Sequence, residues 1–221
     1  MSLPLSQSLW SPEEYLTRER EAFERHEWID GVVYAMAGES PQHSLISSNV
    51  NAILNLQLRG RPCAVYSPNM KVYSRLPADT GLKGLFSYPD TTIVCGEALF
   101  HDQERDVLTN PRVVIEILSP TTERYDRGKK FLRYQQNPSL TDYVLIAQTY
   151  PSVEHYVRQE NGSWVYSVTT ALTASVPLAS LECELPLTEV YDRIEFPLTE
   201  DDVLQRNPCE CDDFLCRDDV H

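Results

Sequence analysis

Residues 113–130, VVIEILSPTTERYDRGKK, constrain the fold of this chain more than any other segment. An apolar run at 112–118 predicts a buried strand, and the charged stretch at 124–136 has the spacing of a helix. A second apolar run at 143–148 predicts another buried strand. Strand, helix and strand in this order favour a β-α-β unit with parallel strands and a right-handed crossover.

Glu116 stands in the middle of the first of these strands. Because side chains alternate along a strand, Glu116 shares one face with Val114 and Leu118, while Ile115 and Ile117 lie on the other. Burial of an unpaired carboxylate is costly unless a metal, a cation or a proton compensates its charge. The sequence therefore predicts either a compensating group beside Glu116 or a cleft on its face of the sheet.

The rest of the chain predicts further helices and strands around this unit. Ser11-Pro12 begins a helix that we expect to end near Phe23, and an apolar stripe predicts a second helix over 41–60. Asp30-Gly31 and Asn161-Gly162 are typical of hairpin turns. The predicted class is α/β, or α+β with a mixed sheet.

Length and composition limit the kind of protein. The 221 residues, 42% of them hydrophobic, suit one domain at 1–196, followed by an acidic, cysteine-containing tail at 197–221. There is neither an apolar run near the ~20 residues of a membrane span nor a secretion signal, so we expect a cytoplasmic protein without membrane contact. Cys63, Cys95 and Cys183 lie in apolar or strand-like surroundings, which predicts reduced buried thiols.

The net charge of −14 counts against a non-specific nucleic-acid binder, because phosphate contacts dominate the affinity of such proteins. From Pro197 onward eight acidic residues face two arginines, a net of −6, so the remainder carries −8. A local basic groove is still available from the following residues: RGR at 59–61, Lys71, Lys83, and the cluster Arg124, Arg127, Lys129, Lys130 and Arg133.

Two carboxylates are expected to meet near the ends of adjacent strands. Asp90 begins a predicted strand, and its carboxylate together with that of Glu116 supplies the oxygen ligands that Mg²⁺ or Mn²⁺ prefers. The backbone carbonyl of Ile117 is the expected further protein ligand. The predicted metal site thus consists of Asp90, Glu116 and Ile117.

Helix geometry distinguishes the two lysines that follow. At about 100° per residue, Lys130 lies roughly 40° from Tyr134 on the apolar side of the helix, whereas Lys129 lies about 140° away and faces solvent. An ammonium that reaches a dicarboxylate site can orient an attacking water or stabilise developing negative charge. Lys130 is therefore the predicted catalytic lysine.

These residues carry a resemblance to a known family. YPDTTIV followed by VVIEILSPTTERYDRGKK resembles the Uma2 (DUF820) endonucleases, a branch of the PD-(D/E)XK nuclease superfamily, and the similarity extends over about residues 15–196. It includes EWIDG, PQHS and YVLI elsewhere in the chain. The resemblance implies a restriction endonuclease-like three-layer core with flanking helices and an added β-hairpin. It also implies Mg²⁺-dependent hydrolysis of DNA phosphodiester bonds.

By the same resemblance, the catalytic residues are Asp90, Glu116 and Lys130. Glu27 is expected to be an extra carboxylate near the metal, and His43 to position water or the phosphate. Leu118 departs from the superfamily pattern, which has a lysine two residues after the glutamate. The resemblance implies that this lysine has moved to the helix.

Other interpretations of the same residues remain open at this point. Glu116 and Lys130 are also compatible with a structural buried ion pair, Glu27 with a solvated hairpin residue, and His43 with an ordinary helix start. The alternative function is a catalytically degenerate nuclease-fold protein that binds or regulates, and the acidity of the chain favours it. For the enzyme, we expect a DNA substrate, Mg²⁺ or Mn²⁺ as cofactor, and an architecture compatible with a homodimer.

Overall fold

A six-stranded sheet lies at the centre of the computed structural model, which describes residues 9–36, 38–75 and 83–196. Its strand order is β11-β10-β9-β8-β6-β3, with the bounds β3 (Cys63–Tyr66), β6 (Thr91–Cys95), β8 (Val113–Leu118), β9 (Asp142–Ala147), β10 (Val153–Arg158) and β11 (Trp164–Thr169). β8 and β9 pair in parallel, whereas the other neighbours in this sheet are antiparallel. The predicted β-α-β unit is confirmed.

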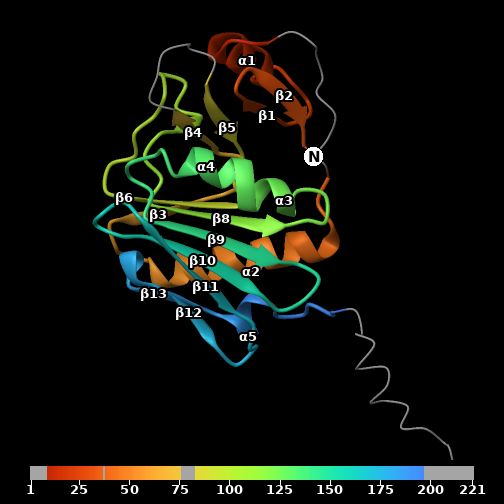
Figure 1. Cartoon of the computed structure of the whole chain (residues 1–221), viewed down its shortest axis with the longest axis vertical. Coiled ribbons are helices and arrows are strands. Elements are labelled where there is room, and N and C mark those ends of the chain that lie inside the picture. Colours follow the sequence, from red (N-terminus) through yellow and green to blue (C-terminus); the bar gives the residue numbers. More distant parts are fainter. Residues whose placement is uncertain (1–8, 37, 76–82, 197–221) are drawn as a thin grey trace, which may run out of the picture.

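Helices cover both faces of this sheet (Figure 1). α2 (Pro41–Gln57) lies on one face. On the other lies a continuous helical segment made of α3 (Glu123–Tyr125), the π-helix η1 (Asp126–Lys130) and α4 (Phe131–Tyr134). Helix, sheet and helix form the three-layer core that the resemblance implies.

A second sheet lies beyond the helical segment, on the side away from the central sheet (Figure 1). Its order is β2-β1-β5-β4-β7, with the bounds β1 (His26–Ile29), β2 (Val32–Ala35), β4 (Lys71–Arg75), β5 (Gly84–Ser87) and β7 (Val107–Leu108). β1 and β2 form the predicted hairpin, and β1 also pairs with the distant β5. Sequence patterns did not predict this second sheet, because pairing between strands so far apart in the chain leaves no local signal.

α1 (Pro12–Glu19) covers the second sheet, where Tyr15 packs with Trp28 and Phe86. The helix ends at Glu19 rather than near Phe23 as predicted. Phe23 is fully exposed, so no apolar contact extends the helix to that residue. At the other end of the chain, β12 (Ser175–Leu178), η2 (Ala179–Leu181), β13 (Cys183–Pro186) and α5 (Leu187–Val190) add to the core beneath α2.

The side chains of β8 divide between two hydrophobic cores. Ile115 and Ile117 pack in the core that includes α2. Val114 and Leu118 pack in the core that includes α4 and strands of the second sheet. Glu116 is only 4% exposed, and strand alternation places it on the face of Val114 and Leu118, as predicted.

The prediction of reduced thiols was wrong for two of the three cysteines. Cys63 and Cys95 stand directly opposite each other in the antiparallel pair β3–β6 and form a disulfide. Cys183 is a buried free thiol, as expected. The predicted tail at 197–221 lies outside the described residues. In the described part of the chain, no helix is long and apolar enough to cross a bilayer.

A buried polar network joins the start of β9 to η2. The carboxylate of Asp142 contacts His155 Nε2 at 2.8 Å and accepts hydrogen bonds from the hydroxyls of Thr141 and Ser180. Burial opposes ionisation of Asp142, but the three hydrogen bonds together outweigh it and lower the pKa of this carboxyl below its ordinary value.

We predict that Asp142→Asn lowers the free energy of unfolding by about 1–3 kcal/mol at pH 7, because the hydrogen bonds to the charged carboxylate are lost. A lowered folded-state pKa stabilises above the unfolded value of about 4, and this stabilisation disappears as pH falls through the folded value. The difference between variant and wild type should therefore shrink below about pH 4 in urea unfolding experiments. Asp192→Asn, at an exposed site, is the control. A difference that persists unchanged at pH 3 would contradict the assignment.

Candidate active site

A pocket of about 330 Å³ opens where the two sheets and the helical segment meet. The second sheet contributes Glu27, the central sheet contributes Glu116, and the helical segment contributes Asp126 and Lys130. Asp90 lines the same pocket from the residue before β6. The structure thus brings together residues that lie as far apart in the chain as Glu27 and Lys130.

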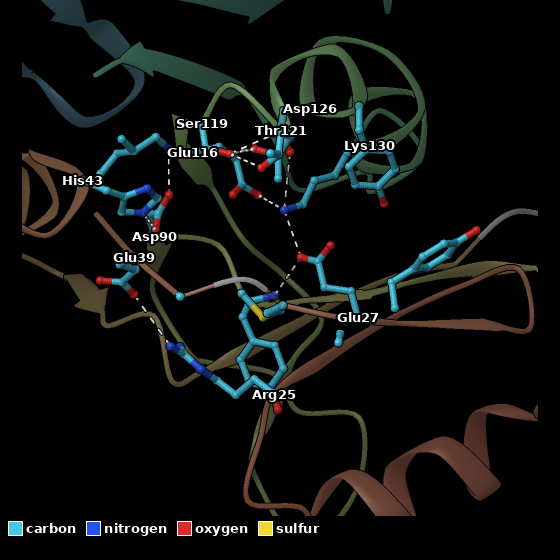
Figure 2. Close-up of a pocket in the computed structure, with 18 of the residues that line it drawn as sticks. Arg25, Glu27, Glu39, His43, Asp90, Glu116, Ser119, Thr121, Asp126 and Lys130 are labelled. Carbon is cyan, nitrogen blue, oxygen red and sulfur yellow. Dashed lines mark hydrogen bonds and ion pairs between the residues drawn. The ribbon is translucent and has the colours of Figure 1, made fainter. Parts of the chain in front are cut away.

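Lys130 occupies the centre of this arrangement. Its ammonium lies 2.9 Å from Glu27 Oε1 and 3.0 Å from Glu116 Oε1, and all three side chains are largely buried. Lys129 is exposed, so the helix presents the predicted lysine to the site. In Figure 2 the carboxylate of Glu116 lies between the Lys130 ammonium on one side and the His43–Asp90 pair on the other.

Asp126 is a further buried acid that the sequence analysis did not select. It is 3% exposed and its Oδ1 lies 3.7 Å from Lys130 Nζ. Both residues belong to η1, a π-helical turn, and such turns are rare in proteins and frequently occur at functional sites. The available signal was the spacing of four residues between Asp126 and Lys130, which places two side chains on one side of a helix.

Asp90 is held in place by two contacts. Its Oδ1 lies 2.7 Å from His43 Nε2, and its Oδ2 accepts a hydrogen bond from the backbone N–H of Ile117 at 2.6 Å. His43 in turn stands in the first turn of α2, where Ser40 caps the helix. Ile117 thus contacts Asp90 through its backbone N–H. The role of its carbonyl as a metal ligand stays a prediction.

Burial and charge shift the protonation equilibria of the central pair. Burial and the negative charges of Asp126, Asp90 and Glu27 raise the pKa of Glu116, against the opposing effect of Lys130. Burial alone would lower the pKa of Lys130, but the surrounding carboxylates outweigh it and raise the pKa. The ammonium form of Lys130 is therefore favoured, and acids from three different elements surround it.

The pKa of the His43 imidazole is also raised. Burial would lower the pKa of His43, but the hydrogen bond to Asp90 and the charges of Asp90 and Glu39 raise it. A larger fraction of this imidazole is therefore protonated near neutral pH than in an exposed histidine.

Two tyrosines of the helical segment contrast with each other. The hydroxyl of Tyr134 donates to Glu116 Oε1 at 2.8 Å and lies 2.7 Å from Ser87 Oγ. The hydroxyl of Tyr125, which also lines the pocket, is buried and has no hydrogen-bond partner among the described residues. The hydrogen bond from Tyr134 thus holds Glu116 Oε1 in place, whereas the Tyr125 hydroxyl forms no hydrogen bond with the described residues of the site.

The donor set suits a hard divalent cation. Five carboxylates line the pocket together with the basic side chains of Lys130, His43 and Arg25; they belong to Glu27, Glu39, Asp90, Glu116 and Asp126. The hydrogen bonds and ion pairs recorded for Glu116 fall on Oε1. Within the described residues no group of three or more His, Cys, Asp or Glu side chains is arranged to hold a metal. Mg²⁺ usually takes only one or two carboxylates together with water and substrate oxygens, and Asp90 with Glu116 meets that requirement.

Comparison with known proteins identifies what this chain resembles. The model of the Uma2 family, described as "Putative restriction endonuclease", matches residues 12–188. Two curated proteins of Synechocystis are similar: uncharacterized protein slr1290 is 35% identical over 155 residues, covering 70% of this chain and 77% of the relative. Uncharacterized protein sll1609 is 30% identical over 152 residues, covering 69% and 82%.

A solved structure has a similar fold. It is described as a "putative nuclease belonging to DUF820" from Anabaena variabilis, and it superposes with a TM-score of 0.67 at 18% sequence identity. The similarity covers 84% of this chain and 99% of the other. The restriction endonuclease-like fold is therefore confirmed by a relative of low sequence identity.

Replacement by Phe is expected to change the free energy of unfolding differently at Tyr134 and at Tyr125. Tyr134→Phe removes a hydroxyl that serves Glu116 and Ser87 and should lower the free energy of unfolding by about 1–3 kcal/mol. Tyr125→Phe removes a hydroxyl without a recorded partner and should leave stability unchanged or raise it. Urea unfolding of both variants at pH 7 measures the difference. Equal losses in the two variants would show that Tyr125 has a partner of its own.

Proposed function

Because this chain belongs to the Uma2 family, we propose that it is a Mg²⁺-dependent endonuclease that hydrolyses DNA phosphodiester bonds. The observation that carries the proposal is the buried ammonium of Lys130, held between Glu27 and Glu116 in a pocket that also holds Asp90. A structural ion pair has no need of an adjoining cavity of about 330 Å³ or of a further acid held beside it.

Asp90 and Glu116 are the residues that we expect to hold the metal, with the carbonyl of Ile117. Bound Mg²⁺ or Mn²⁺ would supply Lewis acidity at the scissile phosphate and lower the pKa of a coordinated water. The contact between Asp90 and His43 keeps that carboxylate oriented toward the pocket, and the bond from Tyr134 does the same for Glu116.

Lys130 is the proposed source of positive charge in the transition state. Its ammonium either orients the attacking water or offsets the charge that develops on the phosphate. Leu118, at the position where the superfamily has its lysine, is a buried core residue, while Lys130 reaches Glu116 from the helix. This arrangement supports the migration of the lysine from the strand to the helix.

Glu27 has a different proposed role from the metal-proximal one expected from the sequence. Because its Oε1 lies 2.9 Å from Lys130 Nζ, it acts as a positioning residue that holds the ammonium in the site, while Glu116 would be one of the metal ligands. Asp126, in the preceding turn of the same helix, contributes to the same task.

The alternative function is a catalytically degenerate protein that uses the nuclease fold for binding or regulation. The net charge of −14 favours it, because such a surface repels DNA. The nuclease requires a bound divalent metal ion, whereas the binding or regulatory protein does not. Metal binding can be measured directly. The expected homodimer, the cytoplasmic location and the division at residues 196 and 197 stay predictions from the sequence.

We predict that Glu116→Gln and Lys130→Ala each reduce Mg²⁺-dependent nicking of supercoiled plasmid by at least about 100-fold. The matched control is Lys129→Ala, which removes the exposed neighbour of Lys130 and should retain wild-type activity. Circular dichroism establishes that each variant is folded at the assay temperature. Full activity of the folded Lys130→Ala protein would refute the assignment of the lysine.

Metal binding separates the two functions without a substrate. Mn²⁺ should raise the melting temperature of the wild-type protein, because a ligand that binds only the folded state stabilises it. The increase should be absent in Asp90→Asn and in Glu116→Gln. Glu182→Gln, at an ion pair outside the pocket, should keep it. A wild-type protein that Mn²⁺ does not stabilise, and that does not nick plasmid at low salt, would favour the binding or regulatory function.

A further inference from the structure

Arg25 is the only arginine among the described residues that line the pocket. It stands immediately before β1 and two residues before Glu27, so strand alternation directs both side chains to the same side of the sheet. Figure 2 shows the ion pair of Arg25 with Glu39, with Glu39 beside the His43–Asp90 pair and Lys130 on the opposite side of the view.

The guanidinium of Arg25 is oriented by neutral groups. Its Nη1 donates to the carbonyl of Pro68 at 3.0 Å and contacts Asn69 Oδ1 at 3.4 Å. The group also lies over the ring of Tyr88, 5.7 Å from its centroid, and the hydroxyl of Tyr88 donates to Glu19 at 2.8 Å. These contacts fix the plane of the guanidinium without neutralising its charge.

The second amino group of the Arg25 guanidinium, Nη2, forms a weak ion pair with Glu39. Arg25 Nη2 lies 3.6 Å from Glu39 Oε1, and the two side chains are 38% and 36% exposed. For comparison, Lys130 and Glu27 are 2.9 Å apart and their side chains are 6% and 12% exposed. An ion pair this long and this exposed contributes little to stability, so an anion entering the pocket can replace Glu39.

A phosphodiester group that binds in this pocket needs a cation whose charge is not already neutralised, as that of Arg25 is not. Five carboxylates, that of Glu39 among them, line the pocket, and a phosphate that approaches them is repelled unless a positive charge meets it. Lys130 is already surrounded by acids, whereas among the residues that the structure describes Nη2 of Arg25 forms an ion pair with Glu39 alone. A guanidinium presents two parallel N–H donors, which match two oxygens of a phosphate.

We propose that Arg25 binds the phosphate of the DNA strand in this pocket, and that Glu39 is the counter-ion that the phosphate displaces. The inference rests on the proposed nuclease function and adds a substrate-binding residue to it. Glu39 then lowers the affinity for substrate, because its contact with Arg25 has to be broken before the phosphate is bound.

A double-mutant cycle tests this exchange. Binding of a short fluorescein-labelled DNA duplex is measured by anisotropy in Ca²⁺ in place of Mg²⁺, so that affinity is measured without turnover. Arg25→Ala should weaken binding by about tenfold or more, and Arg25→Lys, which keeps the charge but loses the fork, by less. Glu39→Gln should tighten binding, and this gain should disappear in the Arg25→Ala background, because Glu39 acts through Arg25.

Arg61 and Glu182 form an ion pair of 2.7 Å outside the pocket and supply the controls. Arg61→Ala and Glu182→Gln should leave the affinity unchanged. Equal weakening by Arg25→Ala and Arg61→Ala, or a gain from Glu39→Gln that persists without Arg25, would overturn this inference while leaving the nuclease function in place. A wild-type protein that neither binds this duplex nor nicks plasmid would overturn the proposed function and this inference with it.

Discussion

The contact of the Lys130 ammonium with Glu27 and Glu116 is the interaction on which this structure depends. Transfer of a charged group into a protein interior costs on the order of several kcal/mol per ion, and attraction between the partners recovers this only when the geometry is close. Here one ammonium lies about equally far from two carboxylates, at 2.9 and 3.0 Å, on different sheets. The same contact therefore permits an acid within β8 and connects the second sheet to the helical segment over the central sheet.

The three carboxylates around Lys130 exceed its charge, and this imbalance gives the site its chemical character. A purely structural pair would approach neutrality, since uncompensated buried charge destabilises the fold. Glu27, Glu116 and Asp126 instead place three acids around one ammonium beside a pocket, and burial raises the pKa of both Glu116 and Asp126, so these two acids give up their protons less readily than exposed carboxyls. An excess of acids over basic groups favours the binding of divalent cations or protons and disfavours phosphate. The cation at the pocket edge, Arg25, is the physical complement of that excess.

The sequence was sufficient wherever one residue pattern determined one geometry. Alternation along β8 placed Glu116 on the correct face, and helical periodicity distinguished Lys130 from Lys129. The sequence was insufficient where the geometry depended on pairing between strands that lie far apart in the chain. The second sheet depends on β1 meeting β5, and the Cys63–Cys95 disulfide on β3 lying opposite β6. Arg25 and Glu39 carry no periodic signal, because only the assembled pocket brings them together.

The division of β8 between two cores limits how this chain can vary in length. Side chains at alternate positions of the strand belong either to the layer beneath α2 or to the layer of the site. Adding or deleting one residue before Glu116 would exchange the two sets, carrying the acid toward α2 and bringing isoleucine to Lys130. A substitution within β8 leaves every other side chain of the strand on its own side of the sheet, so insertions and deletions are expected only in the loops on either side of it.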